Sequence, residues 1–264
     1  MKRLCIFILL LIVHCISKDI NEEVIYDDPS LVGYYSLKNP KNKDFQESLK
    51  QIEEKAVSFK GEFSMKIQSG ENLKNTDRVN GKIFYSKEKT KMKIQLLDPF
   101  FGLVLAQIVS DDDSIKIKPM GKDKITEQPM GDINIIDPTT KRVIAIPYHV
   151  IYNTIRWNFS KVFSLGDTRL NPTEKKVVVR KQTEEFKYEF YEGGITSLEY
   201  KSIPKNLQAK CKVAQTALDG SYPPKAMTNK VTDLVSGKDT SYVEIQYKNI
   251  SKNSKFTDSD FTIQ

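Results

Sequence analysis

The chain has 264 residues, a formal net charge of +7, three cysteines and two histidines. The basic residues are spread along the chain and form no patch, so the charge argues against a nucleic-acid-binding protein. Histidine and cysteine are too few for a zinc site, and a Ser-His-Asp or Cys-His arrangement would have to use His149. Cys211 is the only cysteine outside the N-terminal region, so no internal disulfide is expected.

The usual enzyme motifs are also absent. The sequence contains no nucleophile elbow, zinc-protease helix, P-loop or dinucleotide-binding glycine pattern. The run Asp111-Asp112-Asp113 lacks the spaced acidic loop of a calcium site and indicates a turn. We therefore expect no catalytic residue, no metal and no cofactor in a protein that is not an enzyme.

The N-terminus has the pattern of an export signal. Lys2 and Arg3 precede the apolar run 4–13, which at roughly ten residues is too short to span the hydrocarbon core as a helix. No other stretch approaches the ~18 consecutive apolar residues of a transmembrane helix. Residues 1–17 are therefore predicted to be a signal peptide.

Two interpretations of its processing remain open. Ile12-Val13-His14-Cys15 resembles a bacterial lipobox, in which the cysteine is acylated, with chains such as palmitate, and becomes the first mature residue. His14 departs from that pattern, which usually has a small residue there. The alternative is cleavage after Ser17, with Cys15 and Ser17 as the small residues of the site. In the first interpretation Cys15 is a lipid anchor that holds the protein on a membrane surface.

Residues 18–44 are polar and carry little pattern, which predicts a tether ahead of one domain at residues 45–264. The domain starts with a short helix, because Leu49, Ile52 and Ala56 recur at helical spacing.

Strands dominate the rest of the domain. Apolar and polar residues alternate over 59–68, and Asn80-Gly81 predicts a turn into a strand at 82–86. Further strands are expected at 92–96, 103–109, 115–117, 177–179, 186–190, 195–201, 210–216, 227–234 and 243–247. About ten strands joined mostly by short turns predict one large curved antiparallel sheet or an open barrel.

One helix is expected to interrupt the sheet. Pro147 suits a first helical position. An apolar stripe then recurs at helical spacing through residues Tyr148, Ile151, Tyr152, Ile155 and Phe159. The helix either packs on the outside of the sheet or forms a lid over its concave side.

Four segments, in this order, resemble the LolA/LolB family, bacterial carriers and receptors of outer-membrane lipoproteins. They are the strand Phe59-Lys60-Gly61-Glu62-Phe63, the turn Leu97-Asp98-Pro99-Phe100-Phe101-Gly102, the helix region from Ala145-Ile146-Pro147 to Ile155-Arg156-Trp157, and Tyr222-Pro223-Pro224-Lys225-Ala226-Met227. The likeness covers roughly residues 47–250 and is closest to LolB, which is itself a lipoprotein.

The resemblance implies a mainly β fold, a half-barrel of antiparallel strands with a helical lid over an apolar cavity. It further implies binding of the acyl chains of lipoproteins or lipids without catalysis, a periplasmic carrier protein as a partner, and a location in the cell envelope, at the outer membrane facing the periplasm. A lipid-sensing module on the same fold and a structural envelope lipoprotein with a filled core remain alternatives.

Two sets of site residues follow from this fold. The cavity is expected to be lined by Phe63, Met65, Ile67, Met92, Ile94 and Leu96, with Ile151 and Ile155 on the lid above; the same residues could instead form an ordinary packed core. Phe100 and Phe101 lie between the strand breakers Pro99 and Gly102, at the tip of a turn. By resemblance Phe100, with Phe101 as second candidate, contacts the membrane; the alternative is that the rings fold back and close the end of the barrel.

Overall fold

The computed structural model describes residues 29–121, 123–136, 143–191, 193–214 and 222–263. The chain divides between Tyr34 and Tyr35 into two compact units, and the described part of the first holds a short helix, η1 (Pro29–Leu31). The predicted signal peptide, Cys15 and the start of the predicted tether lie outside the described residues. Among the helices that are described, none has both the length and the apolar character needed to cross a membrane.

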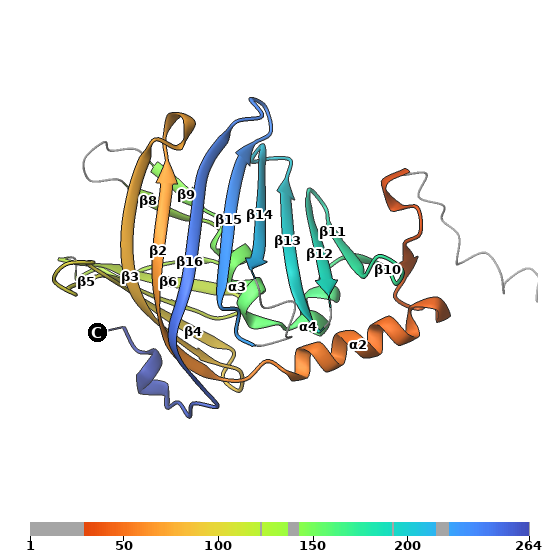
Figure 1. The fold of residues 1–264 in the computed structure, drawn as a ribbon, viewed down its shortest axis with the longest axis horizontal. Helices are drawn as coiled ribbons and strands as arrows, with labels where there is room; N and C mark the ends of the chain where they lie inside the picture. Colours follow the sequence, from red (N-terminus) through yellow and green to blue (C-terminus); the bar gives the residue numbers. More distant parts are fainter. Residues whose placement is uncertain (1–28, 122, 137–142, 192, 215–221, 264) are drawn as a thin grey trace, which may run out of the picture. The chain divides into compact units, whose positions relative to one another are not determined.

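The second unit is built on one antiparallel sheet of fourteen strands (Figure 1). Their order in the sheet is β1-β10-β11-β12-β13-β14-β15-β16-β2-β3-β4-β5-β6-β7. The bounds in the first part of the chain are β1 Tyr35–Ser36, β2 Phe59–Ser69, β3 Asn75–Ser86, β4 Lys91–Leu97, β5 Val104–Ser110, β6 Ser114–Pro119 and β7 Thr126–Pro129. Those in the second part are β10 Asp167–Asn171, β11 Lys176–Lys181, β12 Glu184–Tyr191, β13 Gly194–Ser202, β14 Leu207–Ala214, β15 Ala226–Asp233 and β16 Asp239–Lys252.

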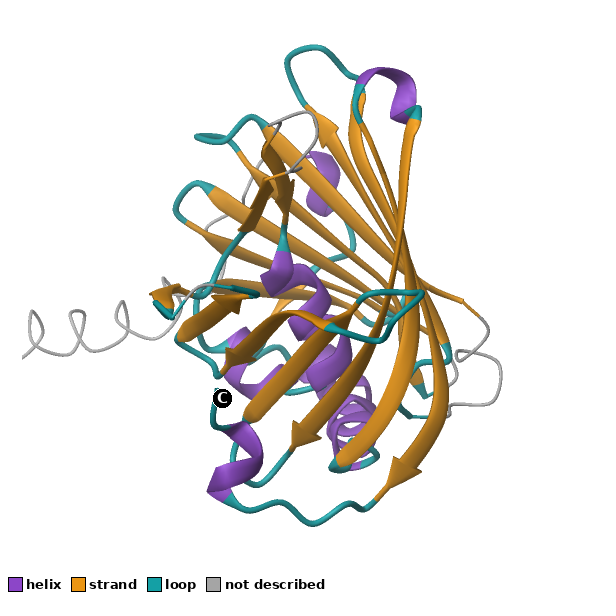
Figure 2. Cartoon of the chain, turned by 90° about the vertical axis from the view of Figure 1, so that its left-hand side faces the viewer, coloured by secondary structure: helices purple, strands orange, loops and turns teal. Residues whose placement is uncertain are grey.

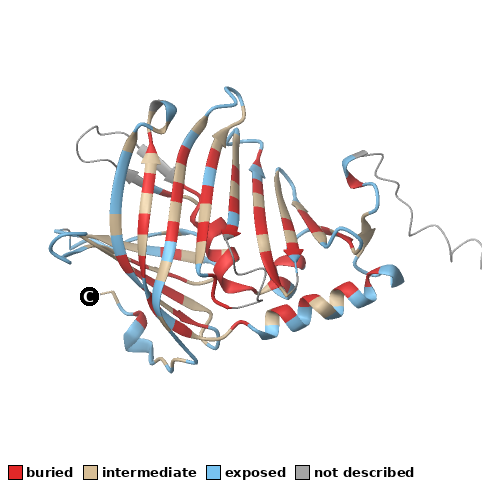
Figure 3. Ribbon diagram, viewed as in Figure 1, coloured by how far each residue is buried: buried red, intermediate tan, exposed pale blue. Residues whose placement is uncertain are grey.

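Alternation of apolar and polar residues gives the sheet one buried face. In β2 every second residue from Phe59 to Ser69 is buried, and the residues between them are exposed or partly exposed. Figure 3 shows the same banding along the neighbouring strands. Because successive side chains of a strand point to opposite faces, this pattern places one apolar face of the sheet inside the unit.

At the centre of the sheet, a strand from near the C-terminus lies beside a strand from near the start of the unit. β16 pairs with β2 in a register that sets Val243 opposite Ile67, Ile245 opposite Met65 and Tyr247 opposite Phe63. All other neighbours in the sheet follow each other along the chain, except β1 and β10. β2 and β16 together therefore connect the N-terminal and C-terminal halves of the sheet.

Two of the helices lie on the inner side of the curved sheet (Figure 2). Between β7 and β10 the chain forms a separate two-stranded hairpin, β8 (Ile133–Ile136) and β9 (Val143–Ile146), and then α3 (Tyr148–Arg156) and α4 (Phe159–Phe163). Figure 2 shows the strands curving around these helices, and α3 contacts β13 and β14. The remaining helices are η2 (Pro40–Asn42), α2 (Lys43–Glu54), η3 (Glu71–Leu73) and η4 (Asp258–Phe261).

The prediction of a mainly β fold with a single antiparallel sheet that stays open is confirmed. The described residues contain sixteen strands, five more than the eleven segments expected, because β1, β7, β8, β9 and β10 have only two to five residues each and carry too little alternation to be recognised. The expected short helix is α2. The structure also pairs Tyr35 and Ser36 of the predicted tether with β10, so these residues belong to the sheet.

The turn predicted at Asn80-Gly81 is wrong. β3 runs through both residues, with Asn80 paired to Ser64 and Gly81 to Phe63. A Cβ atom on Gly81 would lie 2.2 Å from the Phe63 ring and 2.7 Å from the carbonyl oxygen of Gln95. The glycine therefore allows close packing inside a strand, which is the other common use of glycine in a sheet.

The single helix expected up to Phe159 is also wrong, because the chain breaks it into α3 and α4. Trp157 takes a left-handed conformation with φ 47°, and its buried indole packs edge-on against Tyr222 at 4.9 Å between ring centroids. Asn158 then caps α4, since its side chain accepts a hydrogen bond from the Lys161 backbone N–H. An asparagine N-cap is a helix start signal that the stripe of apolar residues concealed.

Candidate functional site

Helix α3 presents two different faces to two pockets. Tyr148, Ile151 and Ile155 lie on one face and line an apolar cavity. Residues 149, 152, 153 and 156 lie on the adjoining face and line a second pocket, with both charged and apolar side chains, that shares no lining residue with the first. Both faces are largely buried, and only Asn153 is partly exposed.

The apolar cavity lies between α3 and the inner face of the sheet, and its volume is about 50 Å³. The structure brings together six of the eight residues predicted to line it, namely Phe63, Met65, Ile94, Leu96, Ile151 and Ile155. Ile67 and Met92 are buried in the core but are not among the lining residues.

The rest of the cavity wall was not predicted from the sequence. The additional lining residues are Ile83, Ile108, Ile133, Ile146, Tyr148, Ile245 and Tyr247. Ile245 and Tyr247 belong to the strand expected at 243–247, where they alternate with polar residues. Their position beside Met65 and Phe63 depends on the β16–β2 pairing, which no local pattern reveals.

A group of charged and hydroxyl side chains fixes the C-terminal end of α3; we call Asp112, Tyr152, Arg156 and Lys161 the Asp112 cluster. The carboxylate of Asp112 accepts hydrogen bonds from the Tyr152 hydroxyl at 3.1 Å and from Arg156 Nη2 at 3.0 Å, and it also pairs with Lys161. The Arg156 side chain is only 5% exposed. Asp112 lies in the turn between β5 and β6, so the cluster ties the helix to the sheet.

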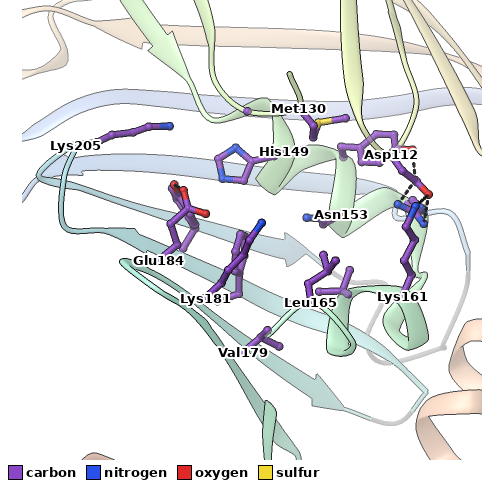
Figure 4. Close-up of a pocket in the computed structure, with 16 residues that line it drawn as sticks. Asp112, Met130, His149, Asn153, Lys161, Leu165, Val179, Lys181, Glu184 and Lys205 are labelled. Carbon is purple, nitrogen blue, oxygen red and sulfur yellow. Dashed lines mark hydrogen bonds and ion pairs between the residues drawn. The ribbon is translucent and has the colours of Figure 1, made fainter. Parts of the chain in front are cut away.

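His149 occupies the floor of the second pocket, whose volume is about 200 Å³. Its Nδ1 lies 3.5 Å from Asp132 Oδ1, and its ring packs edge-on against Tyr200 at 4.3 Å between centroids. Burial lowers the pKa of His149 against the opposing effect of the Asp132 carboxylate, so the imidazole is neutral at neutral pH. In Figure 4 Lys205, Glu184 and Lys181 surround the space beside this ring.

The β4–β5 turn carries the two phenylalanines that the sequence singled out. Phe100 and Phe101 are 87% and 82% exposed, and neither ring folds back into the sheet. Their backbone N–H groups both donate to Asp98 Oδ1, at 2.9 and 2.7 Å, and Gly102 closes the turn with φ 67°. Further exposed apolar side chains lie at the same end of the sheet, on Leu103, Val104, Met120 and Ile125.

The described residues contain no group of three or more histidine, cysteine or acidic side chains placed to hold a metal ion. No protein-family model matches the sequence, and no curated protein sequence matches it.

Solved structures reveal the fold. A LolA superfamily protein from Nitrosomonas europaea superposes with a TM-score of 0.53 at 12% identity, covering 83% of this chain and 97% of that one. The chain has a LolA-like fold. A domain assigned to outer membrane lipoprotein sorting from Vibrio parahaemolyticus aligns over 83% of this chain and 96% of its own, at 9% identity and a TM-score of 0.44. A DUF1329 family protein from Desulfovibrio piger aligns over 83% and 96% at 12% identity, with a TM-score of 0.48.

The LolA-like fold confirms the resemblance inferred from the four sequence segments as far as architecture is concerned. In this fold the apolar cavity and α3 occupy the inner face of the open sheet, and the β4–β5 turn projects from its end.

Proposed function

We propose that this protein is a non-enzymatic, lipid-anchored protein of the cell envelope that binds acyl chains beneath α3 and takes part in lipoprotein or lipid transfer to the outer membrane. The observation that carries the proposal is the apolar cavity between α3 and the inner face of a LolA-like sheet, lined by thirteen side chains of which eleven are Ile, Leu, Met or Phe. The names of the similar structures, a LolA superfamily protein and a lipoprotein-sorting domain, agree with this function.

The apolar cavity is too small to hold an acyl chain as it stands. At about 50 Å³ it is far smaller than the ~300–1,000 Å³ of typical ligand pockets, so an acyl chain enters only if the cavity opens. The sheet strands are held by their ladders of hydrogen bonds, whereas α3 contacts the sheet through side chains. Making room by an outward movement of α3 would therefore leave the strand ladders intact, but it would have to loosen the contacts between Asp112, Tyr152 and Arg156.

The exposed turn supplies the second part of the proposal. The rings of Phe100 and Phe101 stay exposed to water in the free protein. Burying each ring in a membrane would lower the free energy by roughly 1.5–3 kcal/mol. We propose that this turn contacts the membrane that the cargo lipid enters, and that a periplasmic carrier brings the cargo.

The small volume of the cavity favours one alternative, a structural envelope protein with a filled core. Saturable binding of a fluorescent fatty acid distinguishes the two. We expect the unmodified protein to bind and Leu96→Phe, which fills the cavity wall, to bind several-fold more weakly; overpacking of this kind costs about 1–3 kcal/mol. Leu207→Phe, the same change at a half-buried residue outside the cavity, is the control. If the unmodified protein binds no fatty acid, or if both variants bind equally well, the acyl-chain proposal fails.

A further inference from the structure

The second pocket of α3 has the features of a binding site in its own right. Its floor is the ring of His149, its polar rim carries Lys181, Glu184 and Lys205, and its apolar wall includes Val179 and Leu165. The volume of about 200 Å³ equals the space of about seven water molecules, which suits a small polar group with a short apolar segment. Lys181 ends β11, Glu184 begins β12 and Lys205 lies in the turn between β13 and β14, and Figure 4 shows the three side chains beside this space.

The imidazole of His149 is the strongest sign of a missing partner. The side chain is only 8% exposed, and neither ring nitrogen has a hydrogen-bond partner among the described residues. Leaving a buried polar group unpaired costs about 1–3 kcal/mol, so such groups are rare away from functional sites. Asp132 lies 3.5 Å from Nδ1, too far for a good hydrogen bond, and its other oxygen accepts from Lys205 Nζ at 2.9 Å.

The charges around the pocket indicate the sign of the ligand. The Asp112 cluster contributes two cations and one carboxylate, Lys205 is paired with Asp132, and Glu184 accepts a hydrogen bond from the Tyr200 hydroxyl at 2.6 Å. Lys181 is exposed and pairs with no carboxylate of the described residues. The lining residues therefore carry an excess of positive charge.

We infer that this pocket binds the anionic end, a carboxylate or a phosphate, of an amphiphilic molecule whose apolar part lies along Val179 and Leu165. Lys181 and Lys205 donate to the anion from the rim. When the ring of His149 gains a proton, Nδ1–H faces the Asp132 carboxylate at 3.5 Å and Nε2–H is left to donate to the anion. Of the charged groups near the ring, Asp132 and Glu184 favour this protonation and Lys205 opposes it. The inference does not depend on the acyl-chain proposal, since the two pockets use different residues.

Nuclear magnetic resonance of the imidazole tests the inference directly. His149 and His14 are the only histidines, so the full chain with His14→Gln reports on His149 alone. The probes are octyl phosphate and octanoate below their micelle concentrations, with octanol as the uncharged control. We expect at least one of the two anions to shift the His149 signals saturably and to raise the pKa of the ring, and octanol to do neither. Which of the two binds more tightly distinguishes a phosphate ligand from a carboxylate.

A matched pair of lysine variants provides the second measurement. Lys181→Met should weaken anion binding about tenfold, the usual effect of one charge-assisted hydrogen bond. Lys201→Met removes an exposed lysine of β13 outside the pocket and should change nothing. The inference is overturned if neither anion shifts the signals, if octanol acts as strongly as the anions, or if the two lysine variants behave alike. Loss of the response in Leu96→Phe would also overturn it, because the effect would then come from the acyl cavity.

Discussion

Phe100 and Phe101 project from a turn that Asp98 stabilises from below, so their exposure is a property of the folded turn. Replacing Phe100 with Glu should lower the melting temperature by no more than about 1–2 °C, since surface substitutions change stability by less than ~0.5 kcal/mol. The same variant should bind liposomes and deliver lipid to them less well. Val235→Glu, at another exposed apolar residue in a turn, is the control. A fall of several degrees with delivery intact would contradict the membrane-contact role.

A substitution at Cys15 tests the proposed lipid anchor. Two or three acyl chains on this residue would hold the protein on a membrane, at ~0.8 kcal/mol per buried CH₂ group. Cys15→Ser should therefore move the protein from the membrane fraction to the soluble fraction after a carbonate wash, whereas Cys211→Ser, at the other cysteine of the expected mature chain, should leave it with the membranes. Retention of the Cys15 variant on membranes would favour ordinary cleavage after Ser17 together with another mode of attachment.

His149 should make stability depend on pH. Burial lowers the pKa of the ring in the folded state below its usual value of 6.5, so the unfolded chain binds more protons than the native one just below pH 6.5. Stability is then complete above that pH and falls, by up to about 1.4 kcal/mol per pH unit, as the pH drops toward the folded-state pKa. Urea midpoints measured from pH 8 to pH 5 should fall more steeply for the unmodified protein than for His149→Phe. Equal slopes would mean that other groups cause the dependence.

At the scale of one element, α3 is held by the Asp112 cluster. Removing the carboxylate in Asp112→Ala leaves Arg156 buried without its partner, which should cost about 3–5 kcal/mol of stability. The double variant Asp112→Ala/Arg156→Met removes both charges and should recover a large part of that loss, as a double-mutant cycle in urea would measure. If the double variant is no more stable than Asp112→Ala, the ion pair is not what fixes the helix.

The sequence predicted much of this element and missed its end. The stripe Tyr148, Ile151 and Ile155 was sufficient to place a helix and the face that lines the cavity. The left-handed residue Trp157 packs its indole against Tyr222, a residue 65 positions later in the chain, and such a distant contact cannot be read from the local sequence; the one local signal of the break was the Asn158 cap of α4. His149 looked uninformative in the sequence because its significance comes from Asp132, Tyr200 and Lys205, which the fold gathers from separate elements.

For the whole molecule, strands of six or more residues could be predicted wherever polar and apolar residues alternate, as in β2 and β16. Their partners could not be predicted, because alternation defines a face but says nothing about which strand lies alongside. This is why Ile245 and Tyr247 were missed as cavity residues although their strand was expected. Gly81 is a second case in which the strand partner decides the structure. An Asn-Gly pair usually indicates a turn, but here the Phe63 ring of the adjacent strand β2 packs against the glycine inside β3.

The sheet should depend on its central strand more than on its C-terminal end. A chain ending at residue 236 lacks β16 and leaves the edges of β2 and β15 unpaired, so we expect it to lose cooperative unfolding and to aggregate. A chain ending at residue 254 keeps all the strands and loses η4 with Phe261; it should fold with a lower urea midpoint. Cooperative unfolding of the shorter chain would show that the two halves of the sheet are independent.

The pairing of β2 with β16 also determines when the sheet can be completed during synthesis on the ribosome. At ~5–20 residues per second, the ribosome makes β16 on the order of 10 to 30 s after β2, since about 170 residues separate the paired Ser69 and Ser241. During that interval the emerging polypeptide has no way to complete its core, and the long-range contacts that would do so form slowly in any case. Such a delay keeps the nascent polypeptide from completing its fold until its synthesis is nearly finished, and an incompletely folded chain is what the proposed export would need.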